Sequence, residues 1–334
     1  MYLIVDQSKD RTELNFRYIE DFVVSPNWTI TLNITEIEEE CKNFWMKINS
    51  SCCDDLSQNE NFNKLHETTV MNGSELCNKI FQNPDLRNVI LNYAEAKKPI
   101  IICTDFLIIP WGLLYFVEQK KFLQQISDLT IIPTIPLGPS PKRLDSSSKS
   151  EWGLIYDTEL EYKVDSNFRD ECSYFTFINC NGLDDLCNKI DGMKFINFIA
   201  HLESKGEKEG PFIRINKNTG YNDQHAKCYF FPKGSCLILS TCHVANTKSA
   251  SYVPLAAKIS AYSKCCVIAS CCLLPALNAV DIAFAFANQL KKEPPTLSIA
   301  ETWRKFQHAE WDTKPLVRFY VIYGTTNVED KAFL

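Results

Sequence analysis

The sequence predicts an α/β fold: a doubly wound, mostly parallel sheet flanked by helices, preceded by an N-terminal, mainly helical accessory segment. From about residue 99, short apolar runs of strand length alternate with helix-length segments, an order typical of parallel sheets covered by helices on both faces. The composition is that of a globular protein with a sizeable core, since 45% of the 334 residues are hydrophobic and 23% are charged.

Residues 1–95 are predicted to be the accessory region, and no motif within them indicates a function. Tyr2–Val5 and Trp28–Ile34 have the composition of strands. Thr35–Glu38 reads as a capping box at the start of a helix, and the apolar residues after it recur at helical spacing. Two further helices are expected over 74–81 and 85–97.

Residues 96–334 are predicted to form the main α/β domain. Its first two strands are expected at Ile100–Asp105 and Leu129–Ile132. The segment 133–150 contains four prolines and a serine-rich run, which predicts a linker or exposed loop. A loop of this kind is also a candidate site for proteolytic processing.

After this loop, strands and helices alternate regularly. Strands are expected at 152–156, 174–178, 194–200, 236–239, 265–270 and 316–323. Helices are expected at 159–170, 183–190, 222–228, 254–262, 280–289 and 297–307. Residues 203–231 are polar and interrupted by glycines, so no strand is expected there.

Two of these strands are each followed by a residue that could take part in nucleophilic catalysis. His201 follows the strand at 194–200, and Cys242 follows Ser240-Thr241 after the strand at 236–239. The carboxyl edge of parallel strands is where open α/β sheets hold their ligands, and a thiol beside an imidazole is a known nucleophile–base pair. The alternative for each residue alone is a structural role in the core, because most buried cysteines are small hydrophobes.

Composition and motifs exclude several other functions. The net charge of −6 provides no basic surface for nucleic acid, and no Gly-rich phosphate loop is present. The 15 cysteines include no C-x-x-C pair, so we expect neither a zinc site nor another metal or cofactor. Unpatterned cysteines, the absence of a signal-like N-terminus and the absence of a clean apolar span indicate a cytoplasmic protein that does not enter a membrane.

An ordered set of motifs over about residues 97–325 resembles the CHAT family, within the caspase-like clan of cysteine peptidases that also contains the separases. Ile196-Asn-Phe-Ile-Ala-His201 is similar to the histidine strand of that family, and Leu237-Ile-Leu-Ser-Thr-Cys242 to its nucleophile strand. Similar segments, in the family's order, are Ile100–Leu114, Cys266–Ser270 with Asp281, and Val317–Gly324.

The resemblance implies a caspase-like fold and a Cys–His dyad. Cys242 would attack a peptide carbonyl and His201 would protonate the leaving amine. The oxyanion would be bound by the backbone amides of Cys242 and of the residue after the histidine. That residue is Leu202 here, where the family has glycine; the amide is retained, but leucine does not favour a positive φ.

The sequence offers one candidate residue for substrate recognition. Asp157, at the end of the strand at 152–156, could face a basic side chain of the substrate; alternatively, it caps the helix that follows. Members of the family often cut a dedicated protein partner in bacterial stress or antiviral responses, which implies a protein substrate and an activating protein partner. The alternative hypothesis is a catalytically degenerate caspase-like scaffold that acts as a protein-interaction module.

Overall fold

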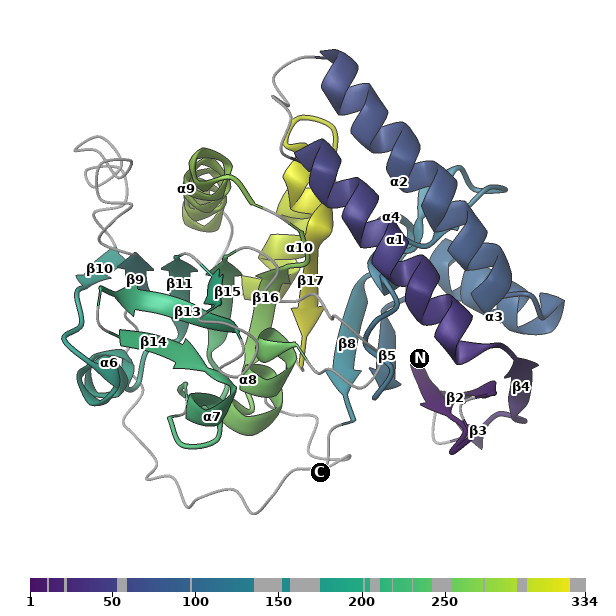
Figure 1. Ribbon diagram of the computed structural model, residues 1–334, viewed down its shortest axis with the longest axis horizontal. Coiled ribbons are helices and arrows are strands. Elements are labelled where there is room, and N and C mark those ends of the chain that lie inside the picture. The colour runs from purple at the N-terminus through teal and green to yellow at the C-terminus, as the bar shows by residue number, and fades with distance from the viewer. Residues whose placement is uncertain are drawn as a thin grey trace. The chain divides into compact units, whose positions relative to one another are not determined.

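The structure is a computed structural model. It describes residues 1–10, 12–20, 23–52, 59–96, 98–134, 152–156, 175–200, 202–204, 211–217, 219–229, 231–241, 254–272, 274–292 and 299–324. The described residues divide into two compact units, one within 1–134 and the other within 152–324. Each unit contains strands and helices (Figure 1).

The first unit is organised around a mixed sheet with the strand order β8-β5-β1-β2-β3, in which β4 also pairs with β2. Strands β1, β5 and β8 run parallel, whereas β2 is antiparallel to its neighbours. The strands are β1 (Tyr2–Gln7), β2 (Glu13–Glu20), β3 (Val23–Val24), β4 (Trp28–Thr31), β5 (Ile100–Thr104) and β8 (Leu129–Pro133). The pairing of β1 with β5 places the beginning of the accessory region in one sheet with the first strand predicted for the main domain.

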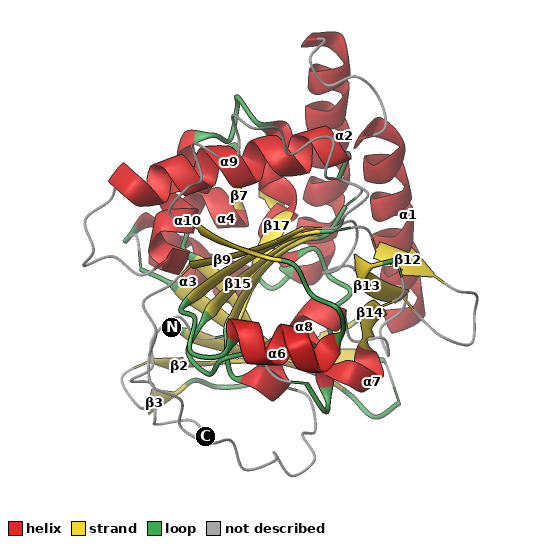
Figure 2. Ribbon diagram, turned by 90° about the vertical axis from the view of Figure 1, so that its left-hand side faces the viewer, coloured by secondary structure: helices red, strands yellow, loops and turns green. Residues whose placement is uncertain are grey.

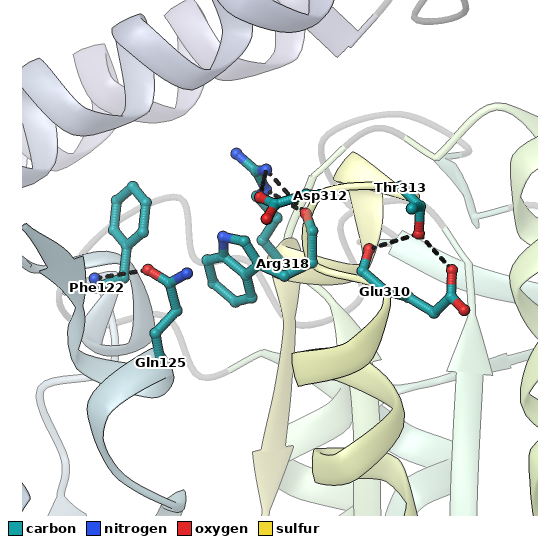
Figure 3. Close-up of polar contacts among 7 residues, drawn as sticks. Phe122, Gln125, Glu310, Asp312, Thr313 and Arg318 are labelled. Carbon is teal, nitrogen blue, oxygen red and sulfur yellow. Dashed lines mark hydrogen bonds and ion pairs between the residues drawn. The ribbon is translucent and has the colours of Figure 1, made fainter.

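Three long helices precede β5 in this unit. They are α1 (Ile34–Cys52), α2 (Asn59–Ile80) and α3 (Pro84–Glu95). The predicted capping box at Thr35 is corrected by the structure, because the Asn33 side chain accepts hydrogen bonds from the amides of Thr35 and Glu36. Short elements follow β5: η1 (Trp111–Leu113), β6 (Tyr115–Phe116), β7 (Lys121–Phe122) and α4 (Leu123–Ile126). In the turn into α4, the Gln125 side chain accepts a hydrogen bond from the Phe122 amide (Figure 3).

The second unit contains the predicted doubly wound sheet, with the strand order β10-β9-β11-β15-β16-β17. The first five strands are parallel and β17 is antiparallel to β16. They are β9 (Trp152–Tyr156), β10 (Phe175–Ile178), β11 (Phe195–Ile199), β15 (Cys236–Ser240), β16 (Cys266–Ser270) and β17 (Tyr320–Tyr323). The predicted fold class is confirmed.

Helices cover both faces of this sheet, as a doubly wound fold requires. Figure 2 shows α9 (Ala276–Lys292) and α10 (Ile299–Ala309) on one face, and α6 (Leu183–Ile190) and α8 (Leu255–Ser263) on the other. The Phe195 ring of β11 packs against Phe286 of α9, with centroids 6.1 Å apart. Every residue of β11, β15 and β16 is buried, which explains why these strands are continuously apolar rather than alternating.

A small antiparallel sheet follows β11 and was not predicted. It consists of β12 (Leu202–Ser204), β13 (Pro211–Asn216) and β14 (Thr219–Asn222), and it is followed by the short helix α7 (Asp223–Ala226). Polar residues and glycines concealed these strands, because their pattern is also that of a loop. The final predicted strand, 316–323, is corrected to the 3₁₀-helix η3 (Pro315–Phe319) followed by β17. The predicted helix at 159–170 and nearly all of the loop 133–150 lie outside the described residues.

Arg318 is a fully buried cation near the C-terminal end of α10 (Figure 3). Its Nε and Nη2 donate to the Trp311 carbonyl at 3.1 and 2.8 Å, and Nη2 lies 3.4 Å from Asp312 Oδ1. Burial lowers the pKa of Arg318 to about 10, which still leaves the guanidinium charged at neutral pH. These bonds fix the turn between α10 and η3, and therefore the start of β17.

Trp303 is a central packing residue of the second unit, and its truncation should destabilise the protein. The indole is buried between Phe286 and Tyr320, with ring centroids 4.8 and 5.0 Å away. Trp303→Ala should therefore lower the free energy of unfolding by about 3–5 kcal/mol, measured by urea denaturation. The matched control is Met71→Ala, at a side chain that is 53% exposed, for which we expect less than about 1 kcal/mol. Equal effects of the two substitutions would contradict this account of the core.

His225 should make stability depend on pH. Its Nδ1 accepts a hydrogen bond from the backbone N–H of Asn222. The pKa of His225 is lowered, chiefly because partial burial disfavours the charged imidazolium. The unfolded chain therefore takes up the proton first, so the contribution of His225 is present above the unfolded pKa of about 6.5 and is lost as the pH falls through the lower folded value.

This contribution can be measured as the change in the midpoint temperature of thermal unfolding between pH 8 and pH 5. The wild-type midpoint should fall more over this range than that of His225→Gln, which keeps an acceptor but does not titrate. Since all other titrating groups are common to both proteins, parallel pH profiles would refute the assignment.

Candidate active site

The candidate site lies at the carboxyl ends of two neighbouring strands of the second unit. β11 and β15 are parallel and in register, with Ile199 paired to Ser240. His201 follows Ile199 by two positions and Cys242 follows Ser240 by two positions. Both residues lie outside the described residues, so the structure describes the strands leading to them. Because parallel strands in register end at one edge of a sheet, the chain approaches both positions from the same edge.

The residues just before Cys242 are buried and polar. Ser240 and Thr241 are 2% and 1% exposed, and among the described residues the Thr241 hydroxyl has no hydrogen-bond partner. Asn197, in the middle of β11, is also buried, and its Oδ1 has no partner among the described residues. Unpaired buried polar atoms are uncommon in structural cores. These two lie in β11 and directly after β15, and others lie elsewhere among the described residues, for example Gln119 Oε1.

The backbone at Leu202 is extended, because this residue begins β12. Among the described non-glycine residues, only Lys120 and Lys264 have a positive φ. The conformation of Leu202 is therefore one that any residue can adopt, and the departure from glycine imposes no backbone strain at this position.

The Leu202 amide points away from the neighbouring strand β13. Leu202 pairs with Ile213 and Ser204 pairs with Pro211. Proline has no N–H, so Ser204–Pro211 cannot be a pair that exchanges two hydrogen bonds. Because such pairs alternate along an antiparallel ladder, Leu202–Ile213 is also a non-hydrogen-bonded pair, and the N–H of Leu202 faces the opposite side.

The pairing of β13 with its other neighbour, β14, supports the same orientation of the Leu202 N–H. The Asn222 amide donates to His225 Nδ1 rather than to β13, at 3.2 Å. Asn222 pairs with Phe212 and Tyr221 pairs with Ile213. By the same alternation, the polar backbone groups of Ile213 face β14 and not β12. Two independent observations, at Pro211 and at Asn222, therefore indicate that the Leu202 N–H faces the outer side of the edge strand β12.

Asp157, the candidate for substrate recognition, also lies outside the described residues. It follows β9, whose last residue Tyr156 pairs with Ile199 of β11. The strands that lead to Asp157, His201 and Cys242 are therefore three consecutive neighbours, β9-β11-β15, in one parallel sheet.

Several of the buried cysteines elsewhere are poor nucleophiles at neutral pH, because their pKa values are raised. Burial raises the pKa of Cys103 and Cys180 to about 11 and that of Cys77 to about 12. The pKa of Cys236 is raised mainly by its hydrogen bond with Cys266 and, to a lesser extent, by burial. The described cysteines are all free thiols, and Cys228 is exposed.

Within the described part of the chain, no group of three or more His, Cys, Asp or Glu side chains is arranged to hold a metal ion. Nor does any helix in that part combine the length and apolar character needed to cross a membrane.

Comparison of the sequence with protein-family models and with curated proteins finds no match. Two solved structures of the Saccharomyces cerevisiae separase–securin complex, in contrast, resemble this chain. The structure at 2.6 Å resolution aligns with a TM-score of 0.59 and 10% identity, and the structure at 3.0 Å with a TM-score of 0.55 and 11% identity.

In both comparisons the alignment covers 97% of this chain and 30% of the other chain, so the chain spans about a third of the length of those neighbours. The likeness shows that the chain has the caspase-like fold of separase. At this level of identity the fold is the shared property, and the activity has to be argued from the site.

Proposed function

We propose that this protein is a caspase-like cysteine endopeptidase that cleaves a protein partner with a Cys242–His201 dyad. The observation that carries the proposal is the in-register parallel pairing of β11 with β15, since each strand leads within two positions to one member of the dyad. The separase-like fold supports it, because that fold is a caspase-like protease scaffold.

In the proposed reaction, the Cys242 thiolate forms a bond to the carbonyl carbon of the scissile peptide. His201 gives its proton to the leaving amine as the carbon–nitrogen bond breaks, and water then hydrolyses the thioester, regenerating the thiol. A neighbouring imidazolium favours the thiolate by lowering the thiol pKa.

The oxyanion would be stabilised by the amides of Cys242 and Leu202, as preorganised N–H donors stabilise tetrahedral intermediates. The orientation of the Leu202 N–H, away from β13, supports its availability for this role. Asp157 is the candidate residue for binding a basic substrate side chain, and helix capping is its alternative role.

We further propose that a protein partner controls the activity. The structural neighbours were solved as a complex of separase with securin, which supports the binding of a protein partner by a chain of this fold. Processing within 133–150 is the alternative trigger. The sequence resemblance alone supports a cytoplasmic role in bacterial stress or antiviral defence.

Substitution of the dyad should abolish proteolysis. Cys242→Ala and His201→Ala should each reduce cleavage by at least about a thousandfold, because the nucleophile and its proton donor act as a unit. The measurement is the appearance of new protein N-termini, detected by N-terminal labelling and mass spectrometry, when the purified chain is added to a cell lysate. Cys228→Ala, at an exposed thiol outside the dyad, should cleave like the wild type. New N-termini produced by Cys242→Ala at the wild-type rate would refute the proposal.

Thiol reactivity separates the peptidase from the degenerate scaffold. At pH 7, iodoacetamide should modify Cys242 at least about tenfold faster than the exposed Cys228, since a paired thiol is ionised at neutral pH. Peptide mapping by mass spectrometry gives both rates from one sample. His201→Ala should remove the difference. A wild-type Cys242 that reacts no faster than Cys228 would favour the interaction-module hypothesis.

A further inference from the structure

A buried hydroxyl pair connects β17, the last strand among the described residues, to the strand that leads to Cys242. The Tyr320 hydroxyl of β17 donates to Ser240 Oγ of β15 at 3.2 Å. Both side chains are fully buried, at 1% and 2% exposure. The bond joins residues 80 positions apart in the sequence, and it crosses β16, which lies between the two strands.

Three independent contacts hold Tyr320. Its backbone pairs with Ser270 of β16, Gln307 Nε2 donates to its carbonyl at 3.1 Å, and its ring packs 5.0 Å from that of Trp303. The same Gln307 amide donates to the Val317 carbonyl at 2.9 Å, which ties η3 to the start of β17. These contacts hold the Tyr320 side chain in place independently of its hydrogen bond to Ser240.

Ser240 is the last residue of β15 and the residue at which the paired part of that strand ends. Its neighbour Ser270, at the end of β16, is likewise buried and donates its hydroxyl to the Cys272 carbonyl at 3.2 Å. Phe195 packs against α9 and pairs with Cys236, so Cys236 lies on the face that carries α9. Because side chains alternate along a strand, Ser240, four residues later, lies on that same face. Tyr320 also lies on it, since its ring packs against Trp303 of α10. Cys242 is two positions after Ser240 in the chain.

We propose that Tyr320 is a positioning residue for Cys242, acting through its hydrogen bond to Ser240. This inference rests on the proposed function and adds to it a residue supplied by the final strand. The bond fixes the side chain at the end of β15 and with it the direction in which the backbone leaves the sheet toward the nucleophile.

The expected effect is on the geometry of the dyad rather than on the fold. Small displacements of a reacting group lower rates strongly, up to about a hundredfold for about 1 Å. Tyr320→Phe removes only the hydroxyl and keeps the ring packing on Trp303 and the backbone bonds to Gln307 and β16. Loss of the bond should therefore weaken the coupling between Cys242 and His201 while the core remains packed.

The test is the pH dependence of iodoacetamide modification of Cys242 in the full chain, followed by peptide mapping, with exposed Cys228 as the internal reference. Tyr320→Phe and Ser240→Ala should each lower the Cys242 rate at pH 7 about tenfold and move the midpoint of its pH profile upward. The double variant should show no further change, because both substitutions remove the same bond.

The control is Tyr323→Phe, which removes a buried hydroxyl from the opposite face of the same strand and should leave the Cys242 midpoint unchanged. Thermal midpoints of all variants separate positioning from folding. If wild-type Cys242 reacts rapidly but Tyr320→Phe leaves both rate and midpoint unchanged, the inference is refuted and the proposed function stands. If Tyr323→Phe produces the same loss, the role of Tyr320 is only structural and the inference is also refuted. If wild-type Cys242 reacts no faster than Cys228, the proposed function itself is wrong.

Discussion

The parallel ladder between β11 and β15 is the constraint on which the candidate site depends. Five consecutive pairs, from Phe195–Cys236 to Ile199–Ser240, fix these strands without a slip. A shift of one residue would turn every side chain of one strand to the other face of the sheet. Since all residues of both strands are buried, such a shift would be costly. The packing of the core therefore holds the register in which His201 and Cys242 each follow the last pair, Ile199–Ser240, by two residues in the sequence.

The segment after β11 has a different role, because it turns from the parallel sheet into a separate antiparallel one. Pro211 is informative in this sheet, since its missing N–H determines which pairs of the β12–β13 ladder exchange hydrogen bonds. The consequence is an amide at Leu202 that faces away from β13. The family that the sequence resembles has glycine at this position, yet the extended backbone of Leu202 needs none. The direction of the N–H is set by strand pairing, which depends little on the side chain.

Residues of α10, η3 and β17 support the carboxyl end of β15. Arg318 fixes the turn after α10 through the Trp311 carbonyl, and Gln307 holds η3 and Tyr320 together. These are hydrogen bonds to backbone carbonyls in a buried region, where an unsatisfied partner is costly. They place one hydroxyl at Ser240, and the chain reaches Cys242 two residues later. The proposed nucleophile thus depends on segments that lie before it and long after it in the sequence.

The sequence by itself determined the α/β class and the strands of the parallel sheet, because continuous apolar runs and their order are local properties of the chain. The dyad of His201 and Cys242 stays a prediction from the sequence. It missed β12, β13 and β14, because these short strands lie in a stretch that is polar and interrupted by glycines and therefore resembles a loop. It also placed the helix cap at Thr35 rather than Asn33, and extended the last strand over residues that form η3. Only the tertiary structure decided the neighbours of each strand, the direction of the Leu202 amide and the contact of Tyr320 with Ser240. These depend on which residues pair across the sheets, and pairing between distant segments is set by the packing of the whole core rather than by any local pattern.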